Sequence, residues 1–243
     1  MPTTALVWIR NDLRVRDHEP LRSAAEHHDR VVPVYCFDPR HVGTTMFDLP
    51  KMGAIRARFL RESVQDLRGS LRNLGADLVV RRGRPENVLP TLVRQTDADE
   101  VLQFQEVGTE ERDVQNAVRD ALRDTDATPG FFWGKTLYHV DDVPFDDPAD
   151  IPNVYTNFRK AVEKKSQVRP PLDAPDALPP LPDDVDPGPI PTLDDLGFED
   201  DGSVDERAVL PFRGGETRGL DRIDEYIWRE DCLKKYKATR NGL

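Results

Sequence analysis

Cysteine is scarce in this 243-residue chain, which contains only Cys36 and Cys232, far apart in the sequence. Two distant thiols form neither a disulfide framework nor a cysteine metal cluster, so we expect both to be buried and reduced in a cytoplasmic protein. No stretch approaches the roughly 20 apolar residues that cross a membrane. The first residues run directly into a strand pattern, without the basic and apolar regions of a signal peptide. We therefore expect no membrane partner.

Lysine is rare as well. Only 8 of the 34 basic residues are Lys, whereas 31 of the 45 acidic residues are Asp, and the net charge is −11. This charge argues against a nonspecific nucleic-acid binder, although a local arginine-rich face could still meet DNA. The excess of Asp over Lys suggests a halophilic source, in which carboxylates keep the surface hydrated at high internal salt.

Glycine is missing from the first predicted strand–helix turn, residues 10–17. A dinucleotide-binding G-x-G-x-x-G loop needs glycines so that the backbone can approach a pyrophosphate, so a Rossmann dehydrogenase is disfavoured. No P-loop and no Gly-x-Ser-x-Gly elbow occur either, and the five histidines lack metal-ligand spacing. Charged residues fill the turn instead. They suggest a charge network with a structural role, in which Asp17 caps the following helix. The sequence shows no recognisable set of catalytic residues.

Short apolar runs alternate with helical periodicity over the first 133 residues. Continuous apolar runs are typical of parallel strands covered on both faces. The sequence thus predicts an α/β fold, a five-stranded parallel Rossmann-like sheet with four flanking helices. The expected strands are Leu6–Ile9, Val31–Phe37, Leu78–Val80, Val101–Phe104 and Phe131–Trp133. The clearest helix spans about Gly53–Leu74, with a face formed by Ile55, Phe59, Leu60, Ser63, Val64, Leu67, Leu71 and Leu74.

The pattern changes after the sheet. We predict an α/β domain over residues 1–134, a connector over 135–212 with a short helix at 155–165, and the start of a helical domain over 213–243. The connector is acidic and rich in proline. A flexible tail is slightly favoured over a long connector that lies on another domain. From Gly214, one helix is expected to carry Leu220, Ile223, Tyr226, Ile227 and Leu233 on one face.

Gln105 and Glu106 follow the fourth predicted strand, at the carboxyl edge where open α/β sheets bind ligands. A carboxylate there can accept two N–H groups from an amino-pyrimidinone edge. The equally weighted alternative is that Glu106 faces solvent or caps the next helix.

Several segments in order resemble the DASH-type cryptochrome branch of the DNA photolyase family, over essentially the whole chain. They are VWIRNDLRVRDHEPL, the run from FDPRHVGTTMFDLPK to PENVLP, QFQEVGTEE, WGKTLYHVDDVPF, VYTNFRKAVEKKSQVR and FRGGETRGLDRIDEYIWREDCLKKYKATRNGL. WGKTLYHVDDVPF and YKATRNGL favour the DASH branch over conventional photolyases.

The resemblance implies a two-domain flavoprotein. An α/β domain helps to hold an antenna, methenyltetrahydrofolate or a deazaflavin, and a helical domain binds FAD and damaged DNA. Blue light then drives repair of cyclobutane pyrimidine dimers, with a preference for single-stranded DNA. Gln105 and Glu106 match folate-contacting positions, Tyr236 matches a tyrosine at the start of the FAD site, and Arg240 matches an arginine near the DNA-binding face.

The sequence ends where the resemblance places the flavin phosphate loop and the helical domain. We therefore expect this polypeptide alone neither to bind FAD productively nor to repair DNA. One interpretation is a repair enzyme whose helical FAD domain is encoded separately. The other is a non-catalytic blue-light photoreceptor or antenna-binding fragment. An ordinary α/β nucleotide-binding protein is disfavoured by the turn at residues 10–17.

Overall fold

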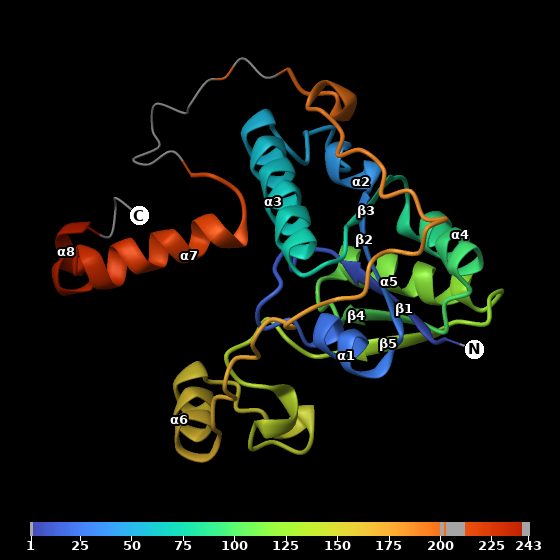
Figure 1. The fold of residues 1–243 in the computed structure, drawn as a ribbon. Coiled ribbons are helices and arrows are strands. Elements are labelled where there is room, and N and C mark those ends of the chain that lie inside the picture. The colour runs from blue at the N-terminus through green and yellow to red at the C-terminus, as the bar shows by residue number, and fades with distance from the viewer. Residues whose placement is uncertain (1, 200–201, 203–211, 240–243) are drawn as a thin grey trace.

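A five-stranded parallel sheet forms the centre of the molecule (Figure 1). The computed structural model describes residues 2–199, 202 and 212–239. The strands are β1 (Thr4–Ile9), β2 (Arg30–Phe37), β3 (Val79–Arg82), β4 (Glu100–Phe104) and β5 (Thr128–Phe132). They lie in the order β3-β2-β1-β4-β5, and every neighbouring pair is parallel. The predicted sheet is confirmed.

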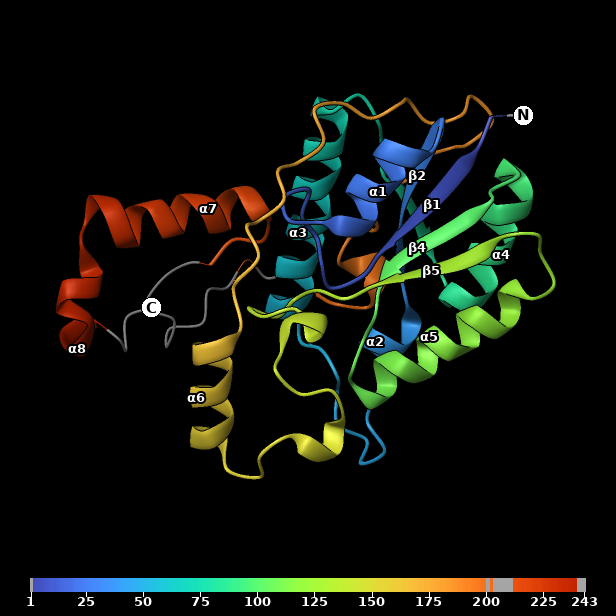
Figure 2. The ribbon, with the colours of Figure 1, turned by 90° about the horizontal axis from the view of Figure 1, so that it is seen from below.

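Helices cover both faces of this sheet. Figure 2 shows α1 (Glu19–His27) and α3 (Ala54–Asn73) on one side, with α4 (Pro85–Thr96) and α5 (Thr109–Leu122) on the other. The side chains of β1 alternate between the two layers: Ala5, Val7 and Ile9 pack with α1 and α3, and Leu6 and Trp8 with α4 and α5. Both faces of β1 are thus buried, which explains its uninterrupted apolar sequence.

The helix predicted at 53–74 forms as α3, but its predicted apolar face is partly wrong. Ile55 and Phe59 are 52% and 46% exposed, whereas Ala57 is fully buried. The first turns of α3 border a cavity beyond the carboxyl edge of the sheet, and Phe59 lines this cavity. Periodicity alone does not tell where a helix extends past the sheet that it covers.

The proline-rich connector lies on the α/β domain itself, so the favoured flexible-tail interpretation is wrong. Leu178, Val185, Leu193 and Leu196 are buried. The amide of Val80 in the edge strand β3 donates to the carbonyl of Pro187 at 2.7 Å, and the Leu178 amide donates to Leu74 at the same distance. A proline residue has no N–H, so its carbonyl oxygen is the backbone group that can form a hydrogen bond with the exposed edge of β3.

Two short 3-10 turns and one helix form a small lobe between the sheet and the connector. They are η1 (Val140–Asp142), η2 (Pro148–Asp150) and α6 (Tyr155–Lys165), the last over the predicted range. Figures 1 and 2 both place α6 to one side of the sheet. The connector adds η3 (Asp194–Leu196), and α2 (Pro39–Val42) follows β2.

The last described segment is not the single helix that the sequence predicted. It consists of α7 (Glu216–Asp224), the π-helical turn η4 (Glu225–Arg229), the 3-10 turn η5 (Cys232–Lys235) and α8 (Tyr236–Thr239). The start of α7 is anchored, because Glu216 accepts hydrogen bonds from the amides of Val15 and Arg16. Its far end projects away from the sheet (Figure 1). Apolar side chains on this segment are exposed, among them Leu220, Ile223, Trp228 and Leu233.

The two cysteines differ in their surroundings. Cys36 is buried as expected, and burial raises the pKa of its thiol to about 12. Cys232 is partly exposed, so the prediction of two buried thiols is wrong for that residue. Within the described residues, no helix is both long and apolar enough to span a membrane, and no cluster of three or more potential metal ligands occurs.

Candidate functional site

The carboxyl ends of β1 and β4 form the switch point of the sheet. From β1 the chain continues to β2 on one side, whereas the chain after β3 crosses to β4 on the other. Loops that diverge in this way leave a crevice, which is where open α/β sheets bind ligands. The loops that begin at Arg10 and Gln105, and residues 133–137 after β5, meet at this edge.

Glu106 lies in this crevice and is largely buried, with 11% of its side chain exposed. Its Oε1 lies 2.5 Å from Nζ of Lys135, and its backbone amide donates to Oε1 of Gln115 at 3.1 Å. The N-cap residue of α5 is Gly108. Glu106 is therefore neither a solvent-facing side chain nor the cap of the next helix, the two structural roles that the sequence left open.

Gln105 is exposed at the same edge. Its backbone amide donates to the carbonyl of Phe132 at 2.7 Å, which extends the pairing of β4 with β5 by one residue. The structure thus brings the two predicted antenna residues to one edge, but only Glu106 is held in place through its side chain.

Lys135 was not singled out from the sequence, yet its ammonium group joins two strands. Besides Glu106, it lies 3.8 Å from Oδ1 of Asp12, at the end of β1. The preceding Gly134 passes so close to the ring of Phe104 that a Cβ there would overlap with it. A lysine two residues after the fifth predicted strand, at the same edge as Glu106, is the signal that could have found it.

Asp12 and His18 form a buried pair beneath this edge, 2% and 1% exposed. Nε2 of His18 lies 2.7 Å from Oδ2 of Asp12, and Oδ1 accepts the amide of Arg10 at 2.9 Å. Burial raises the pKa of Asp12, but the hydrogen bond with His18 and the charges of His18 and Lys135 outweigh it and lower the pKa overall. Asp12 therefore pairs with His18 and Lys135. The arginines of the turn, Arg10 and Arg14, donate to backbone carbonyls rather than to the carboxylates of the predicted network.

The cap of α1 is His18 rather than Asp17, which corrects the sequence prediction. Nδ1 of His18 accepts the amide of Leu21 at 3.1 Å. Asp17 adopts a left-handed backbone with φ of 49°, and its carboxylate accepts the amide of Leu172 in the connector. The turn places Asp17 one residue too early to cap the helix.

Arg10 occupies the place where a dinucleotide-binding protein needs glycine. Its guanidinium lies 4.5 Å from the ring centroid of Trp8 and donates to the carbonyl of Glu111 at 3.0 Å. Burial lowers its pKa, an effect that the neighbouring carboxylates oppose. The packed side chain of Arg10 therefore occupies the first turn, where a pyrophosphate-binding loop would need free space along the backbone.

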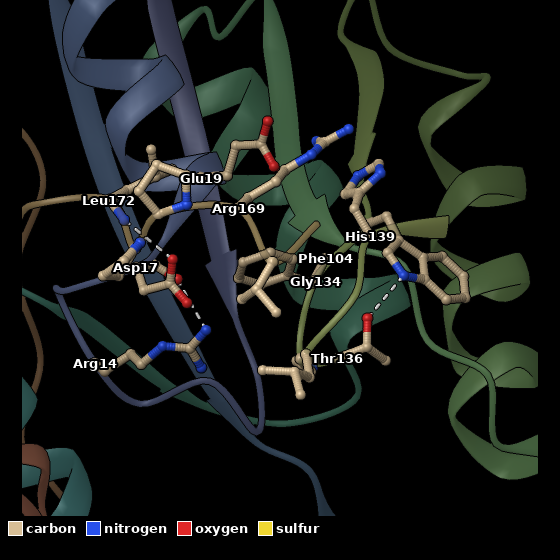
Figure 3. A pocket seen from close by; sticks show the side chains of 15 residues that line it. Arg14, Asp17, Glu19, Phe104, Gly134, Thr136, His139, Arg169 and Leu172 are labelled. Atoms are coloured by element: carbon tan, nitrogen blue, oxygen red, sulfur yellow. Dashed lines mark hydrogen bonds between the residues drawn. The ribbon is translucent and has the colours of Figure 1, made fainter. Parts of the chain in front are cut away.

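Two cavities open at this edge. The first, about 480 Å³, lies between the carboxyl edge of the sheet, the segment that follows β5 and residues 168–172 of the connector (Figure 3). Lys135 lines it, together with Phe104, Trp133, His139 and Arg169. In Figure 3, Phe104 and Gly134 lie together between Arg14 and His139. The second cavity, about 540 Å³, lies between β1, β2 and the first turns of α3, and its lining includes Tyr35, Lys51, Arg56 and Phe59.

Tyr236 lies apart from this site. It begins α8 at the far end of α7, is 51% exposed and lines neither cavity. Arg240 lies outside the described residues. Within the described residues Tyr236 is only half-exposed beside the terminal turns, and its contact with a flavin stays a prediction.

Comparison with known proteins identifies the fold. The profile of the DNA photolyase family matches residues 5–180. The chain belongs to the DNA photolyase family. It is 55% identical over 99% of its length to a protein named cryptochrome DASH from Gloeobacter violaceus, and 45% identical over its full length to a protein of the same name from Xenopus laevis. It covers 47% of each of these relatives.

A solved structure supports the same assignment. The crystal structure of a Synechocystis sp. cryptochrome matches 99% of this photolyase-family chain with a TM-score of 0.90 and 40% sequence identity. The chain covers 49% of that structure. The resemblance to DASH-type cryptochromes is thus confirmed, and the chain spans about half the length of the relatives that it matches.

Proposed function

We propose that this chain holds the light-harvesting antenna of a DASH-type cryptochrome or photolyase, with Glu106 as the group that binds a folate antenna. The observation that carries the proposal is the largely buried Glu106 carboxylate at the switch point. Lys135 holds it at 2.5 Å and also lines the 480 Å³ cavity. Each carboxylate oxygen has two lone pairs, so Glu106 can still accept the N–H groups of an amino-pyrimidinone edge.

The activity proposed for the whole protein needs a second half. We propose that a helical domain, joined to this one or separately encoded, binds FAD and damaged DNA. Its reaction would be blue-light-driven repair of cyclobutane pyrimidine dimers, with single-stranded DNA preferred because extrusion of the dimer then costs less stacking. Membership of the DNA photolyase family supports a light-driven function, and the match to only half of each relative supports a second domain. A non-catalytic blue-light photoreceptor with the same antenna is the alternative.

The second cavity supports a different antenna. Its volume of about 540 Å³ and the aromatic rings of Tyr35 and Phe59 would fit a planar chromophore of the deazaflavin type. Arg56 is the cation that would face an anionic chromophore there, since Lys51 pairs with Glu110 at 2.7 Å. Glu106 lines neither cavity, and its link to the first cavity is Lys135, which lines that cavity and not the second. The two antenna classes therefore depend on different residues.

Glu106→Gln is expected to weaken binding of methenyltetrahydrofolate by about 10–100-fold, because charge-assisted hydrogen bonds are each worth about 1.5–3 kcal/mol. The amide keeps the shape of the side chain but loses its charge and one acceptor. Binding is measured by titrating the purified chain with methenyltetrahydrofolate and following its absorption and fluorescence.

The matched control is Asp124→Asn, which removes one exposed carboxylate after α5, far from the switch point. It should leave folate affinity unchanged. Equal affinity in Glu106→Gln would refute the assignment of Glu106. Retention of a deazaflavin but not of the folate by the unaltered chain would move the antenna to the second cavity.

We also propose that the acidic surface is an adaptation to high salt. Many of its carboxylates repel one another at a net charge of −11, and the Debye length shrinks from about 10 Å at 0.1 M salt to about 3 Å at 1 M. The free energy of unfolding by urea should therefore rise between 0.1 M and 2 M KCl. Equal stability at both concentrations would contradict the proposal.

A further inference from the structure

Lys135 is the cation that reaches Glu106 among the described residues. Nζ lies 2.5 Å from Glu106 and 3.8 Å from Asp12, so one ammonium bridges carboxylates from the loops that follow β4 and β1. The side chain of Lys135 is 25% exposed, that of Glu106 11% and that of Asp12 2%. The bridge is therefore largely shielded from water, where the attraction between opposite charges is stronger than at an open surface.

The neighbouring arginines donate to backbone carbonyls rather than to Glu106, although Glu106 is the carboxylate that most opposes the lowering of the Arg10 pKa by burial. Arg14 donates to the carbonyls of Arg16 and Asp17, and Arg10 donates to the carbonyl of Glu111. If the Lys135 ammonium were absent, Glu106 would face the buried charge of Asp12 without a direct partner, and like charges at this range repel.

The backbone of Lys135 is unusual. Its φ of 66° lies in the left-handed region, which residues with side chains rarely adopt and glycine adopts easily. Such a conformation persists where the surroundings impose it, and it clusters at functional sites. Here the chain first passes directly over Phe104 at Gly134 and then turns Lys135 back toward the ends of β1 and β4.

We propose that Lys135 is a positioning residue of the Glu106 site. It orients the carboxylate and neutralises it, so that the site selects a neutral ligand edge that donates N–H groups, as a 2-amino-4-oxopyrimidine does, over a cationic group. The proposal rests on Glu106 as the folate-binding group. Lys135 acts through Glu106, so its effect on ligand affinity disappears when Glu106 no longer carries a charge.

A double-mutant cycle tests this dependence. The dissociation constant of methenyltetrahydrofolate is measured for the unaltered chain, Lys135→Met, Glu106→Gln and the double variant. Lys135→Met should weaken binding about tenfold, on the scale of a lost charge-assisted contact. The double variant should match Glu106→Gln within about twofold, because the second change then removes nothing further.

Lys135→Gly guards against a folding artefact. It removes the side chain while suiting the positive φ, so it should be at least as stable as Lys135→Met and show the same loss of affinity. Lys160→Met, which removes an exposed lysine of α6, is the matched charge control and should bind as the unaltered chain does.

The outcomes separate the two proposals. Unchanged affinity in both Lys135 variants would overturn the positioning role while leaving Glu106 in place. A double variant weaker than Glu106→Gln by the whole factor of Lys135→Met would also overturn it, since Lys135 would then contact the ligand independently. Unchanged affinity in Glu106→Gln would instead overturn the folate site itself.

Discussion

Asp12→Ala is expected to lower the free energy of unfolding by about 3–5 kcal/mol, the range for removing one member of a buried charged pair. The substitution leaves His18 buried at 1% exposure without its carboxylate partner, 2.7 Å away in the unaltered protein. It also removes the acceptor of the Arg10 amide. These losses act on the loop that joins β1 to α1, so they affect the centre of the sheet.

Urea unfolding at pH 7 measures the effect. Asp113→Ala, an exposed aspartate on α5, is the control and should change stability by no more than about 0.5 kcal/mol. Asp12→Asn should lie between the two, because the amide keeps an acceptor for Arg10 but not the negative charge beside His18. A loss below about 1 kcal/mol in Asp12→Ala would mean that His18 finds another partner, contrary to the structure.

Gly188→Ala is expected to destabilise the chain by about 2–3 kcal/mol and to detach the connector from the sheet edge. Gly188 has φ of 74°, and a Cβ there would lie 2.6 Å from the carbonyl oxygen of Val80 and 2.8 Å from Nη1 of Arg81. The obstructing Val80 oxygen belongs to the backbone of β3 and cannot move without disturbing the sheet. The change therefore breaks the contact through which the connector covers this strand.

Limited proteolysis within residues 170–198, together with urea unfolding, measures this effect. Gly69→Ala is the matched control, because Gly69 lies on the exposed side of α3 with nothing within 4 Å of a new Cβ. Alanine in a helix interior should raise stability by about 0.5–1 kcal/mol relative to glycine. Equal protease resistance of Gly188→Ala and the unaltered chain would show that the connector is held by other contacts.

Strands β1, β2 and β4 could be predicted because almost all of their residues are buried, on both faces, whereas β3 and β5 are partly exposed. A run such as Val31–Phe37 needs no partner to be recognised, since its continuous apolarity already excludes a half-exposed strand. Helix α6 could also be predicted from the sequence, because proline-rich segments bound it on both sides. The exclusion of a dinucleotide loop followed from one local fact, the absence of glycine from residues 10–17.

The errors share one cause, which is dependence on neighbours distant in sequence. The prolines of the connector exclude helix and so favour a tail, but the carbonyl of Pro187 accepts the amide of Val80 in β3, about 100 residues earlier. Ile55 and Phe59 fit an apolar period, yet the sheet does not reach them. The terminal segment was predicted as one helix from its spacing, whereas the π and 3-10 turns interrupt it.

The sequence by itself determined the parallel sheet, the position of Glu106 at a carboxyl edge and the resemblance to DASH-type cryptochromes. Only the tertiary structure decided what Glu106 contacts. The ends of β1, β4 and β5 meet because of the strand order, and that order brings Asp12, Glu106 and Lys135 together from positions more than 120 residues apart at the extremes. The ion pairs of Lys135 with Asp12 and Glu106 depend on the distances between three loops that are far apart in the sequence. Local periodicity and composition carry no information about such distances.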